Sequence, residues 1–191
     1  MVCKLFETFF RDALYQHLTV NNLLSKDQFG FCKGRSCVSQ LLVTIKEWMT
    51  KLDEGIPVDS IYLDFSKAFD TVPHQRLLLK LKGYGISENV LSWVSDFLSD
   101  RSQRVAVNSA KSVSAPVTSG VPQGSVLGPV LFIYYINDLP SVTNGILKIF
   151  ADDTKSYSPI QSDSDCQNLQ NCINDLTNWS DKWQLKFNSK K

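Results

Sequence analysis

Three aspartates, Asp64, Asp152 and Asp153, are the residues of this chain best suited to chemistry. Asp152 and Asp153 are adjacent and lie between two apolar stretches, where neighbouring carboxylates repel each other and lose hydration unless a cation compensates. At the tip of a tight hairpin both side chains can reach one site, although an Asp-Asp pair is equally at home in an ordinary turn. The pair alone is compatible with a cation site and with an ordinary turn.

Asp64 ends a segment, 60–65, in which polar and apolar residues alternate as in a half-buried strand. A third carboxylate delivered by a separate strand can complete an oxygen cage of the kind that magnesium prefers. Two such ions about 4 Å apart activate a primer 3′-hydroxyl and stabilise the leaving pyrophosphate in an in-line displacement. The pattern favours nucleotidyl transfer, and the structural alternative for Asp64 is a residue that caps the next helix.

Two further segments carry groups suited to binding a nucleotide. Lys33 and Arg35 lie in the stretch 30–36, whose glycines let the backbone approach a triphosphate while the two cations bind it. The stretch does not match a P-loop, and a solvated loop of charges is the alternative. Gln123 lies in the turn 119–125, where its amide can bind a nucleotide or template, although turn chemistry alone also explains it.

The elements that must position these residues follow from hydrophobic periodicity. Helical spacing predicts helices over 4–18, after Ser36, from Pro73, after Ser87, over 125–136 and over about 163–183. Alternation predicts strands over 60–65, 146–151 and 155–157, and a hairpin from 103–107 and 112–118. This order is typical of an α+β domain with mostly antiparallel strands.

Composition narrows the classes of protein. With 191 residues, 43% of them hydrophobic, the chain can bury a core, and its net charge of +1 argues against a free-standing nucleic-acid binder. Five cysteines are odd in number and lack zinc-site spacing, so we expect reduced thiols in an intracellular protein. No apolar run reaches 18 residues and no signal peptide is evident, so no membrane association is expected.

Four segments in order resemble the reverse-transcriptase domain of non-LTR (LINE-type) retrotransposons, close to the jockey-like elements. They span nearly the whole chain. The fingers motif of the family is similar to Gln28 to Ser36 (QFGFCKGRS), and its motif A is similar to Tyr62 to His74 (YLDFSKAFDTVPH). Its motif B is similar to Ser119 to Pro129 (SGVPQGSVLGP), and its motif C is similar to Phe150 to Asp153 (FADD).

The resemblance implies roles for particular residues. Asp64, Asp152 and Asp153 would be the catalytic metal ligands, for two magnesium ions or manganese in their place. Phe69 would exclude ribonucleotides by blocking a 2′-hydroxyl, and Gln123 would contact the incoming nucleotide. The other expected substrate contacts are Lys33, Arg35, Phe65 and Lys191, the last as the proton donor to pyrophosphate in a segment similar to motif D. Cys32 departs from the family, which usually has a basic residue there.

The resemblance also implies an organisation and an activity. The expected fold is a right-hand polymerase palm, an antiparallel sheet backed by helices, with partial fingers over 1–58 and the palm over 59–191. Inserted helices and a hairpin occupy about 75–118, and no thumb or endonuclease is expected. The implied activity is RNA-directed DNA synthesis from deoxynucleoside triphosphates on an RNA template and DNA primer, in the nucleus and cytoplasm.

Two alternatives stay open at this point. A catalytically inactive remnant of such an element would keep the fold and bind nucleic acid without polymerising. A metal-dependent nuclease would also need clustered carboxylates, but it explains neither Gln123 nor Phe69.

Overall fold

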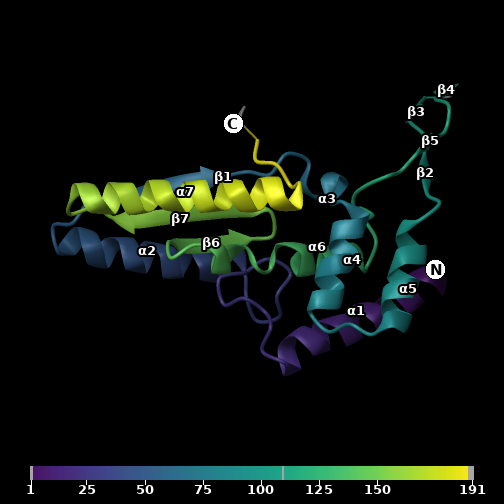
Figure 1. Cartoon of the computed structure of the whole chain (residues 1–191), viewed down its shortest axis with the longest axis horizontal. Coiled ribbons are helices and arrows are strands. Elements are labelled where there is room, and N and C mark those ends of the chain that lie inside the picture. The colour runs from purple at the N-terminus through teal and green to yellow at the C-terminus, as the bar shows by residue number, and fades with distance from the viewer. Residues whose placement is uncertain (1, 109, 189–191) are drawn as a thin grey trace.

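The computed structural model describes residues 2–108 and 110–188, in which helices and short strands are mixed along the chain (Figure 1). The helices are α1 (Val2–Val20), α2 (Cys37–Asp53), α3 (Ala68–Thr71), α4 (His74–Gly83), α5 (Glu88–Leu98), α6 (Gly128–Ile136), the 3-10 helix η1 (Leu139–Val142) and α7 (Asp163–Trp183). The strands are β1 (Val58–Leu63), β2 (Ser102–Gln103), β3 (Ala106–Val107), β4 (Ala110–Lys111), β5 (Ala115–Pro116), β6 (Ile146–Phe150) and β7 (Asp153–Pro159). The predicted α+β class is confirmed.

The main sheet has the strand order β1-β7-β6, and both of its strand pairs are antiparallel. A two-residue turn joins β6 to β7, because Phe150 lies opposite Asp153, and Ala151 in that turn has a left-handed φ of 56°. Leu63 at the end of β1 lies opposite Thr154. The register brings the end of β1 beside the start of β7.

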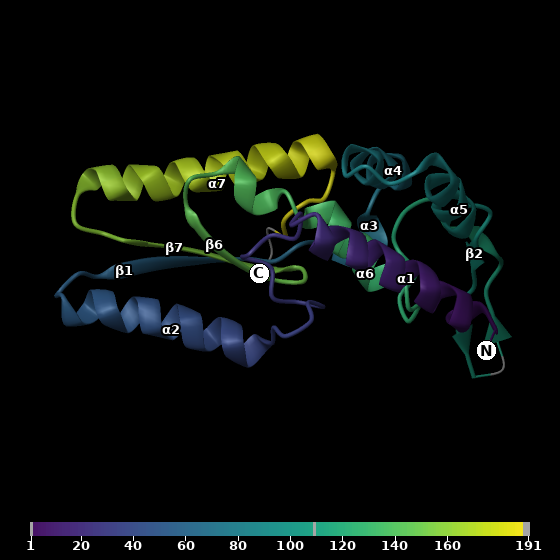
Figure 2. The same ribbon diagram turned by 90° about the horizontal axis from the view of Figure 1, so that it is seen from below.

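Two long helices cover opposite faces of this sheet (Figure 2). On one face, α7 turns Leu169, Cys172, Leu176 and Trp179 inward, as its helical spacing requires. On the other face, α2 begins at the cap Ser36, whose hydroxyl accepts a hydrogen bond from the backbone amide of Ser39. The sheet therefore lies in the middle of three layers.

Beyond the sheet, α6 forms the centre of the hydrophobic core. Val130 to Ile136 are all buried. Helices α1 and α4 pack against α6, and α5 packs on α4 at the opposite end of the molecule from α2 (Figure 1). Glu7 of α1 is buried, and its carboxylate accepts hydrogen bonds from the amides of Val126 and Leu127 at the start of α6. An acceptor there satisfies amides that have no partner within the helix.

The structure changes three details of the expected elements. The helix predicted from Ser125 begins at Gly128, because the Ser125 hydroxyl accepts from the Gly128 amide and ends the preceding turn. The hairpin predicted over 103–107 and 112–118 is two short ladders instead. The short helix α3 was not predicted. Within the described part of the chain, no helix combines the length and apolarity that crossing a bilayer needs.

Candidate active site

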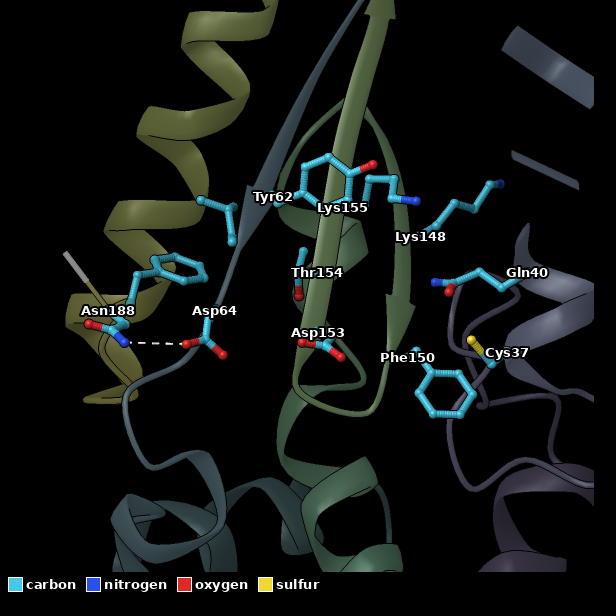
Figure 3. A pocket seen from close by; sticks show the side chains of 12 residues that line it. Cys37, Gln40, Tyr62, Asp64, Lys148, Phe150, Asp153, Thr154, Lys155 and Asn188 are labelled. Atoms are coloured by element: carbon cyan, nitrogen blue, oxygen red, sulfur yellow. Dashed lines mark hydrogen bonds between the residues drawn. The ribbon is translucent and has the colours of Figure 1, made fainter. Parts of the chain in front are cut away.

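A cavity of about 540 Å³ lies between the sheet and the start of α2. Asp64 and Asp153 both line it, together with the hydroxyl-bearing Thr154 and the paired lysines Lys148 and Lys155 (Figure 3). Antiparallel alignment of Leu63 with Thr154, continued by one residue, sets Asp64 across from Asp153. Two of the three predicted aspartates thus come from separate strands to one space.

The segment just after α7 holds Asp64 in place. The backbone amide of Asn188 donates to the carbonyl of Asp64 at 2.7 Å, and the side-chain amide donates to its carboxylate at 3.3 Å (Figure 3). One residue further on, Phe65 forms a bridge with Phe187. Asn188 is therefore a positioning residue for Asp64.

The Asp152-Asp153 pair lies at the β6–β7 turn, as predicted, but its two members differ. Asp153 is exposed and lines the cavity, whereas Asp152 is half-buried and does not contribute to the lining. The shared placement of both carboxylates in one metal site stays a prediction.

A buried glutamine supports this turn from the other side. Gln28 is 1% exposed, and its side-chain oxygen accepts hydrogen bonds from the amides of Gly30, at 2.7 Å, and Ala151, at 2.9 Å. Gly30 lies so close that a Cβ there would overlap the backbone of Ala151. The segment similar to the fingers motif therefore packs directly on the turn that carries Asp152 and Asp153.

Gln123 lies in a turn that docks on the segment after Asp64. Its side-chain amide donates to the Asp70 carboxylate at 2.8 Å, and the amide of Val121 donates to the carbonyl of Phe69 at 2.7 Å. The Phe69 ring stacks on Phe132 of α6, with 4.4 Å between ring centroids. Phe69 and Gln123 are thus brought together in one assembly, although neither lines the cavity around Asp64.

The remaining predicted contacts lie elsewhere. Lys33 is exposed, and one guanidinium nitrogen of Arg35 donates to the carbonyls of Ser25, Lys26 and Gln28, so that Arg35 braces this loop. Phe65 is buried and does not line the cavity itself, but it stacks on Phe187, which does. Lys191 lies outside the described residues. The roles given to these four residues stay predictions.

Cys32, which departs from the family pattern, is a buried thiol. It is 6% exposed and donates to the carbonyl of Gly30. Burial raises the pKa of the Cys32 thiol, and the nearby Arg35 cation only partly opposes this rise. The thiol is therefore neutral near pH 7 and supplies no charge to the site.

The donor set fits a divalent ion of the magnesium class. Magnesium is commonly bound by one or two carboxylates together with substrate phosphates, and Asp64 and Asp153 supply two carboxylates facing one cavity. Over residues 2–108 and 110–188, no three His, Cys, Asp or Glu side chains are grouped so that they alone could hold a metal ion. Substrate oxygens would complete the coordination.

Sequence reasoning missed Gln28, Asn188 and Thr154 as site residues. The Thr154 hydroxyl is buried against the cavity and has no hydrogen-bond partner among the described residues. A polar residue directly after two aspartates, at an inward position of a strand, was the available signal for Thr154. Gln28 and Asn188 gave no such signal, because the partners that link them to the site, Ala151 and Asp64, are more than a hundred residues away.

Comparison with known proteins decides the family. A profile described as "Reverse transcriptase (RNA-dependent DNA polymerase)" matches residues 1–191. The chain belongs to the reverse transcriptase family. This reverse transcriptase domain is 30% identical over 203 residues to a protein named "Probable RNA-directed DNA polymerase from transposon BS" of Drosophila melanogaster, matching 98% of this chain and 22% of the relative.

Other similar proteins come from the same kind of mobile element. A probable RNA-directed DNA polymerase from the transposon X-element of Drosophila melanogaster is 30% identical over 196 residues, which is 100% of this chain and 22% of the relative. The polymerase from its mobile element jockey is 30% identical over 200 residues, 98% and 21% of the two chains. The predicted resemblance to jockey-like, non-LTR elements is confirmed, and the chain spans about a fifth of the length of these relatives.

Solved structures support the fold. A telomerase of Candida tropicalis, solved in a complex with a fragment of telomeric RNA, aligns with a TM-score of 0.68 at 14% identity, covering 95% of this chain and 32% of that one. A truncated apo form of telomerase from the same organism gives a TM-score of 0.64 at 15% identity over 96% of this chain and 39% of that one. The α+β arrangement with antiparallel sheets thus fits a reverse transcriptase polymerase fold.

Proposed function

We propose that this reverse transcriptase domain carries the polymerising centre of an RNA-directed DNA polymerase. In this proposal it extends a DNA primer on an RNA template with deoxynucleoside triphosphates. The observation that carries the proposal is that Asp64 and Asp153, delivered by β1 and β7, face one cavity (Figure 3). Family membership supports the same reaction.

The chain's own residues divide the work as follows. Asp64, Asp153 and Asp152 would hold magnesium or manganese, and the bound ion would supply activation of the primer hydroxyl and charge neutralisation at the phosphates. Asn188 fixes the direction of the Asp64 carboxylate. Gln28 fixes the turn that carries the other two carboxylates.

Further residues would select and hold the substrate. Phe69, held by its stack on Phe132, would meet the sugar, while Gln123 would meet the base or template strand. Lys33 and Arg35 would meet the triphosphate, with Phe65 as a supporting contact and Lys191 as proton donor. In this proposal residues 1–58 act as partial fingers and 59–191 as the palm, with 75–118 as its insertion.

Primer extension on an RNA template with magnesium tests the proposal directly. We expect Asp64→Ala, Asp152→Ala and Asp153→Ala each to lower incorporation by about a hundredfold or more, because loss of metal-based charge stabilisation costs several kcal/mol. Asp59→Ala is the matched control, since Asp59 is an exposed aspartate on β1, the strand that ends just before Asp64, and this variant should extend primers normally.

Two outcomes would contradict the proposal. Extension that persists in the three aspartate variants would move the chemistry to other residues. A folded wild-type chain that binds primer-template without extending it, with either magnesium or manganese, would favour an inactive remnant that keeps the fold.

A further inference from the structure

Residues 101–108 and 110–118 form an arm that projects from the body of the molecule (Figure 1). Two short antiparallel ladders build it: Ser102 lies opposite Pro116, and Ala106 lies opposite Lys111 nearer the tip. All described residues over 102–116 are exposed. The arm therefore adds nothing to the hydrophobic core, and its shape needs another explanation.

The charge of the arm differs from that of the rest of the chain. It carries Arg101, Arg104 and Lys111 and no acidic residue. Taking these three cations from the chain's 20 leaves 17 Lys and Arg against 19 Asp and Glu. The arm is thus a positive projection on a chain that is otherwise slightly negative, which concentrates favourable interactions with an anion there.

The ladder places two of the cations together. Lys111 is directly opposite Ala106, and Arg104 lies two residues before Ala106. Arg104 precedes β3 and lies near Lys111, because Val105, the next residue, pairs with Ser112, the residue after Lys111. The amide of Ser112 donates to the carbonyl of Val105, and the amide of Val105 donates to the Ser112 hydroxyl. These two hydrogen bonds continue the pairing of β3 with β4 by one residue.

The exposed valines of the arm raise the alternative of a protein partner. Val105, Val107 and Val113 are 66%, 63% and 87% exposed. Val105 and Val107 flank Ala106 in a short apolar run, but residues 101–118 contain no aromatic residue, whereas protein interfaces are enriched in aromatic side chains. Three cations without a carboxylate fit a phosphate backbone better.

We propose that the arm contacts the phosphate backbone of an RNA–DNA heteroduplex, away from the cavity that holds Asp64. This inference rests on the proposed function for the identity of the duplex, but not on catalysis. Arginine and lysine contacts to phosphates position a duplex without reading its sequence. The arm therefore adds affinity and salt dependence, and it holds template and product while the primer end is at the cavity.

Fluorescence anisotropy with a labelled RNA–DNA heteroduplex, without nucleotides or metal, tests the arm by itself. The variant is Arg101→Gln/Arg104→Gln/Lys111→Gln, titrated between about 50 and 200 mM salt. We expect the slope of log affinity against log salt to fall by about 2 to 3, and the affinity near 100 mM salt to fall on the order of tenfold or more. Arg104→Gln alone should change the slope by about 1.

The matched control removes the same charge from the body of the molecule. Lys46→Gln/Lys51→Gln/Lys82→Gln changes three lysines of α2 and α4 and should leave the slope and affinity near those of the wild type. Thermal unfolding of both triple variants should match the wild type, because no charge of the arm lies in the core.

Three results would overturn the inference. They are an unchanged salt slope in the arm variant, an equal loss in the control variant, and a wild-type chain that does not bind the heteroduplex. A change in association state without a change in heteroduplex binding, measured by sedimentation, would assign the arm to a protein partner instead. The variants of Asp64, Asp152 and Asp153 should still bind the heteroduplex. Loss of primer extension and loss of heteroduplex binding therefore test the proposed function and the role of the arm separately.

Discussion

Gln28 illustrates how a single buried amide can support the site from behind. Its oxygen accepts from the amides of Gly30 and Ala151. Gln28→Met keeps the size of the side chain and leaves both buried donors unsatisfied, at about 1–3 kcal/mol each. We expect the free energy of unfolding, measured in urea, to fall by roughly 2–4 kcal/mol.

The control for this substitution is Gln167→Met on the exposed face of α7. Surface changes of this kind stay within about 0.5 kcal/mol. If Gln28→Met were as stable as the control, the two hydrogen bonds would contribute nothing, and Gln28 could not be said to hold the turn.

At the scale of single residues, the sequence predicted those site residues whose side-chain type alone indicates a chemical role. Aspartates at strand ends are chemically distinctive, so Asp64 and Asp153 could be named in advance, and they do share a cavity. Gln28 and Asn188 are ordinary amides whose importance depends on partners far away in the chain. Arg35 was read as a ligand for phosphate, but one of its nitrogens serves three loop carbonyls, which only tertiary structure reveals.

At the scale of elements, the turn over residues 119–124 depends on a close approach between two backbones. Gly120 has a φ of +88°, and a Cβ there would lie 2.6 Å from the carbonyl oxygen of Asp70. Gly120→Ala combines backbone strain with steric overlap, and strain alone costs about 1–3 kcal/mol. We expect a loss of unfolding free energy of more than about 2 kcal/mol, together with reduced primer extension as Gln123 shifts.

Gly124→Ala separates the two effects. Its φ is +79°, but no atom lies within 4 Å of the added Cβ. It should lose only the strain, about 1 kcal/mol. Equal losses in the two variants would show that the contact with Asp70 is not tight.

Periodicity predicted most elements because long amphipathic patterns report burial directly. The polar helix was expected from about 163 to 183, and α7 runs over Asp163–Trp183. Short elements gave weaker patterns. The four-residue α3 follows Lys67 in a left-handed conformation, φ 49°, which no spacing of apolar residues could indicate. The arm was expected as one hairpin because alternation does not reveal where a ladder breaks.

At the scale of the whole molecule, Lys80 joins three parts of the fold. This lysine of α4 is 5% exposed and forms an ion pair with Asp138, next to η1. Its ammonium also lies over the rings of Trp179, at 4.6 Å, and Trp183, at 4.1 Å, on α7. Burial lowers the pKa of Lys80 to about 8, although the Asp138 carboxylate opposes this.

This shift gives the unfolding free energy a pH dependence of definite sign. Between about pH 8 and 10 the unfolded chain keeps the Lys80 proton and the folded chain releases it, so stability rises with pH by roughly 2 kcal/mol. Above about pH 10 the trend reverses, because burial raises the pKa of Tyr134 and Tyr135 in the folded chain. Urea unfolding across this range measures both limbs.

Lys80→Met should abolish the rise between pH 8 and 10, while the exposed Lys82→Met should keep it. A rise that survives in the Lys80 variant would assign the proton to another group.

The pairing of β1 with β7 also has a consequence for the order in which the protein is made. Leu63 pairs with Thr154, which leaves the ribosome 91 residues later. At about 5–20 residues per second, β1 waits roughly 5 to 18 s for its neighbour in the sheet. During that interval Asp64 has no opposing carboxylate and β1 has no strand beside it, which makes the nascent chain vulnerable to misassociation. The two carboxylates therefore cannot face each other until residue 153 has been synthesised.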